Sequence, residues 1–210
     1  MSNLLESLNW RYATKKYDAS KKISPEDLET LKEATKLSVS SMGLQPFKVI
    51  IIENPELRAK LAPAGYNQSG ITEASQLFVF AVENNVGARQ IEAYMKNISE
   101  TREIPVESLQ GFSDMILGSI AGLDQEGRNN WSIKQAYLAL STLINTAAVL
   151  KIDATPMEGF NAQQFDEILG LEKLGLTTAV IASVGYRHEE DATQHYKKVR
   201  KSNEEFFINL

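Results

Sequence analysis

The sequence predicts a fold of the α+β class, with α/β as the alternative, in which a mixed sheet is sandwiched between helices. Three nearly continuous apolar runs, at residues 47–52, 77–82 and 178–184, are typical of strands that are covered on both faces. Stretches with a helical apolar pattern lie between the second and third runs. Because no repeat, low-complexity segment or long linker divides the chain, we expect one domain over residues 1–210.

The first helices are marked by apolar spacing and by a clear start signal. A short helix is expected at residues 4–10, followed by one that begins after Ser24 and ends near Ser38. Ser24 can cap the helix, Pro25 suits its first position, and the two acids that follow favour its positive end. Ile23 and Leu28 occupy the positions of a hydrophobic staple.

Three further helices are expected at residues 88–98, 106–123 and 131–150. The last is apolar on almost every side from residue 136 to 150, so it should be buried. Two interpretations remain open. It lies at a subunit interface, where a charge at Leu143 would prevent assembly, or it is the central helix of one domain.

Polar and turn-rich stretches separate these elements. Residues 62–70 and 84–87 are expected to be loops, and the polar segment 98–111 is a candidate mobile flap. A short extended stretch at 152–155 leads into the turn Pro156-Met157-Glu158-Gly159, after which a helix is expected at 161–169.

The composition excludes several classes of function. The chain of 210 residues carries a net charge of −5, which argues against a dedicated nucleic-acid binder. It has no cysteine, which excludes disulfides, thiolate metal sites and a dithiol relay. With only two histidines, it is also a poor candidate for a histidine-rich metal centre, and no metal site is predicted. A redox role would therefore need an organic cofactor or a metal held by other ligands.

The termini and apolar runs carry no membrane or export signal. The N-terminus lacks a basic region followed by an apolar core, and the longest apolar runs are too short to cross a bilayer. We therefore expect a cytoplasmic protein that acts on small molecules without a membrane partner.

Cations stand at both ends of a chain that has no glycine-rich phosphate loop. Arg11 near the start and Lys198 and Arg200 near the end could hold a phosphate, because such groups form charge-assisted hydrogen bonds with it. Lys198 and Arg200 alternate across one residue, so in an extended stretch both would point the same way. The alternative is an ordinary solvated basic cluster.

The turn Pro156-Met157-Glu158-Gly159 presents consecutive N–H groups at the edge of a sheet, which suits a planar heterocycle with acceptor atoms. It resembles the flavin-facing turn of the nitroreductase family. Three other segments match that family in order: residues 11–15, 40–47 and 198–200. The plain alternative is a surface glutamate in a turn, with Gly159 supplying a positive φ.

The resemblance implies an intertwined homodimer that binds FMN, with NADH or NADPH as co-substrate. Hydride would pass through flavin N5 to nitroaromatic or quinone acceptors in a ping-pong cycle. Two alternatives from other classes remain: a flavin-binding carrier or sensor without turnover, and a specialised flavin enzyme such as an enone reductase or dehalogenase.

The same resemblance implies which residues contact the cofactor. They are Arg11, Tyr12, Ala13, Lys15, Ser40, Ser41, Gly43, Asn67, Gln135, Pro156, Met157, Glu158, Gly159, Lys198 and Arg200. Of these, Ser40, Ser41, Gly43 and Gln135 match residues that reach the partner's cofactor, which implies shared sites.

Lys15 and Glu158 are implied as the catalytic residues. Lys15 would lie beside flavin N1 and O2, where negative charge accumulates on reduction, and the N–H groups of Glu158 and Gly159 would face N5 and O4. The sequence departs from the family twice. Ala13 stands where serine is usual, and Gly70 where relatives often have a lysine, so Lys15 is expected to be the only cation at that edge.

Overall fold

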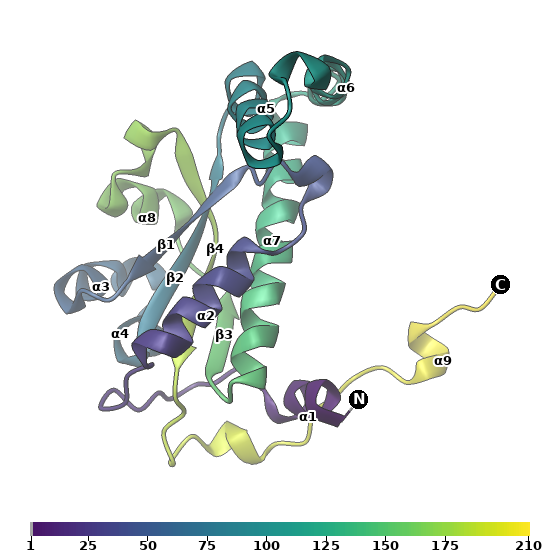
Figure 1. Cartoon of the computed structure of the whole chain (residues 1–210). Helices are drawn as coiled ribbons and strands as arrows, with labels where there is room; N and C mark the ends of the chain where they lie inside the picture. The colour runs from purple at the N-terminus through teal and green to yellow at the C-terminus, as the bar shows by residue number, and fades with distance from the viewer. Residues whose placement is uncertain (1) are drawn as a thin grey trace.

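A four-stranded antiparallel sheet with helices on both faces forms the body of the computed structural model, which describes residues 2–210 (Figure 1). The strand order is β1-β2-β4-β3. The strands are β1 (Phe47–Ile52), β2 (Gln76–Glu83), β3 (Asp153–Met157) and β4 (Leu176–Gly185).

The α+β class is confirmed, but the expectation of a mixed sheet is wrong within the chain. All three strand pairings are antiparallel, with Val49 opposite Phe80 in one and Val79 opposite Ile181 in another. The apolar runs indicated burial on both faces. A strand that is buried on both faces has the same apolar pattern in a parallel sheet and in an antiparallel one. Strand direction was therefore not readable from them.

Nine helices accompany the sheet in the part of the chain that the structure describes. They are α1 (Ser2–Trp10), α2 (Pro25–Lys36), α3 (Pro55–Leu61), α4 (Gly70–Glu73), α5 (Ala88–Arg102), α6 (Gln110–Ala121), α7 (Gln125–Val149), α8 (Ala162–Leu169) and α9 (Asn203–Phe206). The predicted start of α2 is confirmed, since Ser24 Oγ accepts the N–H of Asp27 at 3.0 Å. No helix among residues 2–210, including the 25-residue α7, has both the length and the apolar character needed to cross a bilayer.

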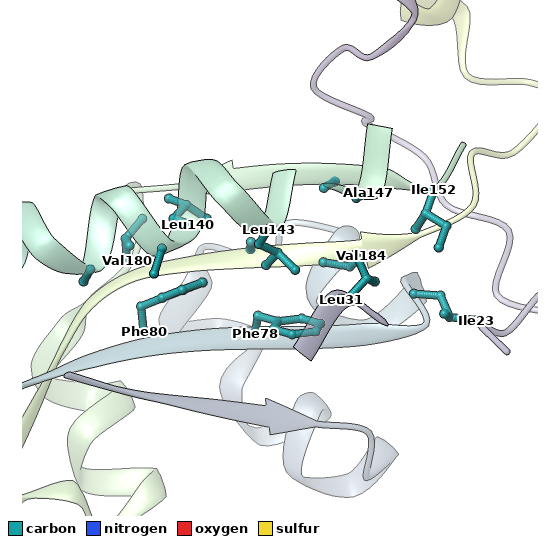
Figure 2. Close-up of a cluster of buried hydrophobic side chains, with 14 of the residues drawn as sticks. Ile23, Leu31, Phe78, Phe80, Leu140, Leu143, Ala147, Ile152, Val180 and Val184 are labelled. Atoms are coloured by element: carbon teal, nitrogen blue, oxygen red, sulfur yellow. The ribbon is translucent and has the colours of Figure 1, made fainter. Parts of the chain in front are cut away.

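Strand β2 divides the core into two layers by simple alternation. Phe78 and Phe80 face α2 and α7, where they pack with Leu140 and Leu143 (Figure 2). Leu77 and Val79 face the opposite layer, which α3, α4 and α8 form. Because successive side chains of a strand point to opposite faces, a strand that is buried at every position except Glu83 serves both layers.

Helix α7 is mainly the central helix of the fold. Leu143 is fully buried against the sheet, so a charge there would disrupt the core, and any loss of assembly would follow from that disruption. The rest of the helix is exposed or half-buried, with Leu138 42% and Val149 40% exposed. The apolar pattern reflects core burial of the face that holds Leu140 and Leu143, and the exposed and half-buried residues of the other sides are available to a partner.

The segment 98–111, predicted to be a candidate flap, is helical. It contains the end of α5, a 3₁₀ turn at Val106–Leu109 and the start of α6. Ile98 and Leu109 are buried with Ile116 in a separate apolar cluster. Figure 1 shows α5 and α6 beside one end of α7, away from α1.

Gly70 begins α4 and is buried against β4 and the N-terminal segment. A Cβ at this position would lie 2.7 Å from Ser183 Oγ and 3.1 Å from the ring of Tyr17. The position faces inward, so a lysine here could not reach a ligand without displacing these neighbours.

Gly70→Ala should therefore lower the free energy of unfolding by about 1–3 kcal/mol, the usual cost of overpacking. The matched control is Gly159→Ala, whose added Cβ would meet no atom within 4 Å and should change stability by no more than about 0.5 kcal/mol. Urea unfolding of the ligand-free proteins measures both. Equal stabilities would contradict the close packing at Gly70.

Candidate functional site

A cavity of about 590 Å³ lies beside α7 and brings together segments that are distant in sequence. Arg11 comes from the N-terminal segment, whereas Pro156 and Glu158 come from the end of β3 and the turn after it. The remaining lining residues are Tyr137, Leu140, Ser141, Ile144, Asn145 and Val180. Two of the predicted site segments therefore meet at one cavity.

The cations at the two ends of the chain also meet. Lys198 Nζ donates to the carbonyl of Leu8 at 2.7 Å and to that of Arg11. Burial and the neighbouring Arg200 lower the pKa of Arg11, and burial, Arg11 and Arg200 lower the pKa of Lys198. Like charges are thus gathered here at an electrostatic cost.

An anion would relieve that cost. The Nε of Arg11 is buried and has no hydrogen-bond partner within residues 2–210. Over the same residues, no carboxylate forms an ion pair with Arg11, Lys198 or Arg200. An unpaired buried donor amid uncompensated cations fits a phosphate group, which accepts several charge-assisted hydrogen bonds.

Lys15 has a fixed backbone and an exposed side chain. Its N–H donates to Asp191 Oδ2 at 2.7 Å, and its carbonyl accepts from Ser69 Oγ at 2.7 Å. Ala13 is exposed on the same side of the extended segment, whereas Tyr12 turns its hydroxyl to Asp191 at 3.0 Å. The Lys15 ammonium is therefore available to a ligand.

Asn67 lies in a tight turn that joins two predicted segments. Tyr66 and Asn67 both have a left-handed φ, of 55° and 54°, and the Asn67 side chain is exposed. The next residue, Gln68, donates to the carbonyl of Gly159 at 2.7 Å, and Ser69 holds Lys15. The turn thus brings Lys15, Asn67 and Gly159 to one edge.

The turn after β3 offers two unused donors. Within residues 2–210, the N–H groups of Glu158 and Gly159 donate to no other protein group. Gly159 does not have a positive φ, so the alternative that it is required for that conformation is wrong. The turn is closed instead by the N–H of Phe160 donating to the carbonyl of Glu158 at 2.9 Å.

Pro156 and Met157 belong to the strand rather than to the turn. Proline is tolerated because β3 is an edge strand that pairs only with β4. Pro156 is exposed toward the cavity, but Met157 points into the opposite core layer and is only 7% exposed. Of the two, Pro156 alone presents its side chain to a ligand.

Tyr137 also lines the cavity, although no sequence motif indicated it. Its hydroxyl donates to Glu158 Oε1 at 2.5 Å. Burial and then the carboxylate of Glu158 raise the pKa of Tyr137 to about 12, so it is neutral at physiological pH. The helical spacing of residues 137, 140, 141 and 144 marks one face of a helix, but only the structure shows that this face lines a cavity.

A second group of predicted cofactor contacts consists of Ser40, Ser41, Gly43 and Gln135. Gln135 Oε1 accepts the N–H of Ser41 at 2.7 Å, and Ser40 Oγ accepts that of Gln45 at 3.1 Å. Gly43 has a φ of 74°, and an added Cβ would overlap the hydroxyl of Tyr94. This loop therefore needs glycine at position 43.

The two groups lie on different sides of α7. Gln135 and Tyr137 are two residues apart, which separates them by roughly 200° around an α-helix. The cavity that Arg11 and Glu158 line includes no residue from the 40–43 loop. Within the described chain, the predicted cofactor contacts therefore form two half-sites rather than one.

The first half-site fits a planar ligand that carries a phosphate. The Arg11 cluster suits the phosphate, and the free N–H groups of Glu158 and Gly159 suit acceptor atoms on a ring edge. The exposed ammonium of Lys15 suits a position where negative charge develops.

A sequence profile of the Nitroreductase family matches residues 8–186. The chain is similar to the major NAD(P)H-flavin oxidoreductase of Aliivibrio fischeri, with 32% identity over 214 residues that cover 99% of this chain and 98% of that protein. Lys198 and Arg200 lie beyond the stretch that the profile matches.

Solved structures share the fold. A nitroreductase-like protein from Streptococcus mutans superposes with a TM-score of 0.87 at 18% identity, covering 100% of this chain and 99% of that one. A protein from Exiguobacterium sibiricum, solved in complex with FMN, gives a TM-score of 0.85 at 22% identity, with 99% and 97% of the two chains covered.

Proposed function

The chain belongs to the nitroreductase family, and we propose that it is an FMN-dependent NAD(P)H oxidoreductase that reduces nitroaromatic compounds or quinones. One observation carries the proposal: Arg11, whose Nε is buried and unpartnered, lines the same cavity as Glu158, whose N–H is free together with that of Gly159. The flavoprotein relatives support the choice of FMN and NAD(P)H.

Each group of the chain has a distinct task in this proposal. Arg11, Arg200 and Lys198 hold the phosphate by charge. When bound, FMN would supply the redox chemistry, which is hydride transfer from NAD(P)H to the acceptor. The N–H groups of Glu158 and Gly159 donate to the ring edge and fix its orientation. Lys15 provides a fixed cation where negative charge develops on reduction, which stabilises that charge without reorganisation.

NAD(P)H and the acceptor would bind in turn at the same open side of the cavity, which is what a ping-pong cycle requires. The cavity beside Arg11 has a mixed lining, in which Leu140, Ile144, Pro156 and Val180 are apolar and Tyr137, Ser141, Asn145 and Glu158 are polar. Tyr137 holds the Glu158 carboxylate by a hydrogen bond, so that charge is drawn toward the helix and away from the free N–H groups. Apolar side chains with a few polar groups among them suit aromatic acceptors that carry polar substituents.

The purified protein should be yellow, and NADH or NADPH should bleach its flavin absorbance in the absence of oxygen. A quinone or a nitroaromatic compound should then restore the colour, and initial rates should give parallel double-reciprocal plots. A protein that keeps its flavin but is reduced by neither nucleotide would be the carrier or sensor. Reoxidation only by enones or by halogenated aromatics would indicate one of the specialised alternatives.

Lys15→Met should lower the midpoint potential of the bound flavin by roughly 30–60 mV, because a hydrogen bond to a charged group contributes about 1.5–3 kcal/mol. It should also slow reduction by NAD(P)H. The comparison variant is Arg11→Met, which should weaken FMN binding more and shift the potential less, since a phosphate has the same charge in both redox states. If the midpoint potential is unchanged in Lys15→Met protein that is saturated with FMN, Lys15 does not lie beside the flavin ring.

We also propose that the protein is a homodimer with shared sites. The 40–43 loop and Gln135 lie across α7 from the cavity, so they can complete a site only in a second copy. Apolar side chains are open on α7, and the C-terminal segment projects from the body with Phe206 67% and Ile208 86% exposed (Figure 1). Obligate interfaces of this apolar kind bury roughly 2,000 Å² or more.

Leu138→Glu should therefore yield a folded monomer that loses its flavin, because a charge on an exposed side of α7 opposes burial between copies. Light scattering reports the mass, circular dichroism the fold, and absorbance the flavin content. Leu174→Glu is the matched control, since Leu174 is 65% exposed but lies outside α7. A flavin-loaded, active monomer in either variant would contradict shared sites.

A further inference from the structure

The N-terminal segment that would carry the cofactor cations is extended, and its side chains alternate. Thr14 is buried, whereas Ala13 and Lys15 are exposed. Tyr17 ends the segment by forming a β-bridge with Arg187. Because alternate side chains of an extended chain point to opposite sides, whatever holds the inner side also decides where the outer side chains point.

Asp191 is one of the groups that hold the inner side. Its carboxylate is 3% exposed. Oδ2 accepts from the N–H groups of Lys15 at 2.7 Å and Lys16 at 3.1 Å and from the Tyr12 hydroxyl at 3.0 Å. Oδ1 accepts from the N–H of Thr193 at 3.0 Å and from its hydroxyl at 2.6 Å. All five groups donate a hydrogen bond to the carboxylate.

These donors keep Asp191 charged. Burial alone would raise the pKa of Asp191, but hydrogen bonds from Thr193, Lys15 and Lys16 outweigh burial and lower the pKa to about 2. The carboxylate is therefore ionised throughout the physiological range, and its hydrogen bonds to the backbone of residues 15 and 16 are of the stronger, charge-assisted kind.

Lys15 is consequently held at both ends of its own backbone. Its N–H is bound by Asp191, 176 positions away, and its carbonyl by Ser69, 54 positions away. Its side chain takes part in no ion pair within residues 2–210. Because the backbone of Lys15 is held and the end of its side chain is free, the ammonium is oriented before a ligand binds. This lowers the entropy cost of ordering it on binding.

We propose that Asp191 is a positioning residue of the cofactor site, whose buried carboxylate fixes the backbone of Lys15 and Lys16 so that the Lys15 ammonium projects toward the reducible ring. This inference rests on the proposed function. It assigns to Asp191 no contact with the cofactor or the substrates.

The sign of one measurement separates positioning from a simple charge effect. If Asp191 acted only as a distant negative charge, neutralising it would stabilise the reduced flavin anion and raise the midpoint potential. If it aims Lys15, neutralising it misplaces a cation and lowers the potential, as Lys15→Met does. The two roles therefore predict shifts of opposite direction.

The test uses full-length Asp191→Asn, which keeps the shape but presents an amide N–H₂ to one of two sets of donors. We expect the flavin midpoint potential to fall, and to fall no further when Asp191→Asn is added to Lys15→Met. Thr193→Val is the matched control, since it removes one donor to the same carboxylate but leaves Lys15 and Lys16 bound. Its potential should stay at the wild-type value.

A second readout needs no flavin. In the cofactor-free protein, amide hydrogen exchange at Lys15 and Lys16 should become at least about tenfold faster in Asp191→Asn, a factor equivalent to about 1.4 kcal/mol. It should stay unchanged in Thr193→Val. If Asp191→Asn fails to fold, Ser69→Ala, which releases the Lys15 carbonyl from the other side, should lower the potential in the same direction.

A potential that rises or stays constant in folded Asp191→Asn would overturn the proposal, as would unchanged exchange at Lys15 and Lys16. A wild-type protein that binds no flavin would overturn the proposed function and with it the role of Asp191 toward the ring. Faster exchange in that case would show only that Asp191 holds the backbone.

Discussion

The ion pair between Asp153 and Arg187 joins the parts of the chain on which the candidate site depends. Asp153 is 2% exposed at the start of β3, and it accepts from Arg187 Nη2 at 2.7 Å and from the Arg187 N–H at 2.9 Å. Thr14 donates to the same carboxylate at 3.1 Å. The Arg187 guanidinium in turn lies 4.2 Å from the Trp10 ring and 4.5 Å from that of Tyr12. This pair, in which Asp153 is buried and Arg187 partly buried, thus ties together the end of α1, the extended N-terminal segment, the start of β3 and the segment after β4. Such a pair adds little net stability, but leaving either charge unpaired costs about 3–5 kcal/mol, so the arrangement specifies where these segments meet.

Helix α7 imposes the second constraint, because its faces serve different purposes. The inner face, which includes Leu140 and Leu143, fills the core against the sheet. Tyr137 lies on the face that lines the cavity, while Gln135 holds the 40–43 loop on another. A rigid helix between the two half-sites keeps them apart in one chain. Within the proposed dimer, the same rigidity would set the spacing at which each half-site meets its counterpart.

The electrostatics of the site are local. The chain carries a net charge of −5, yet Arg11, Lys198 and Arg200 are close enough to lower the pKa of Arg11 and Lys198. At physiological ionic strength, charges farther apart than about 8 Å are largely screened. A phosphate would therefore respond to this cluster rather than to the acidic surface elsewhere, and an acidic protein can hold an anionic ligand.

The sequence by itself determined all four strands, the longer helices and most of the candidate segments, but not the short helices α3, α4 and α9. The apolar run at 47–52 coincides with β1, Ser24 caps α2 as its chemistry requires, and the four matching segments indicated the family. These are local properties, set by side-chain periodicity and by the backbone preferences of neighbouring residues.

The tertiary structure decided the rest. It made the sheet antiparallel, turned Met157 and Gly70 inward, placed Leu143 in the core rather than at an interface, and brought Tyr137 to Glu158 and Asp191 to Lys15. Each of these outcomes depends on which segments pack against one another across tens to hundreds of residues, and no local pattern encodes that.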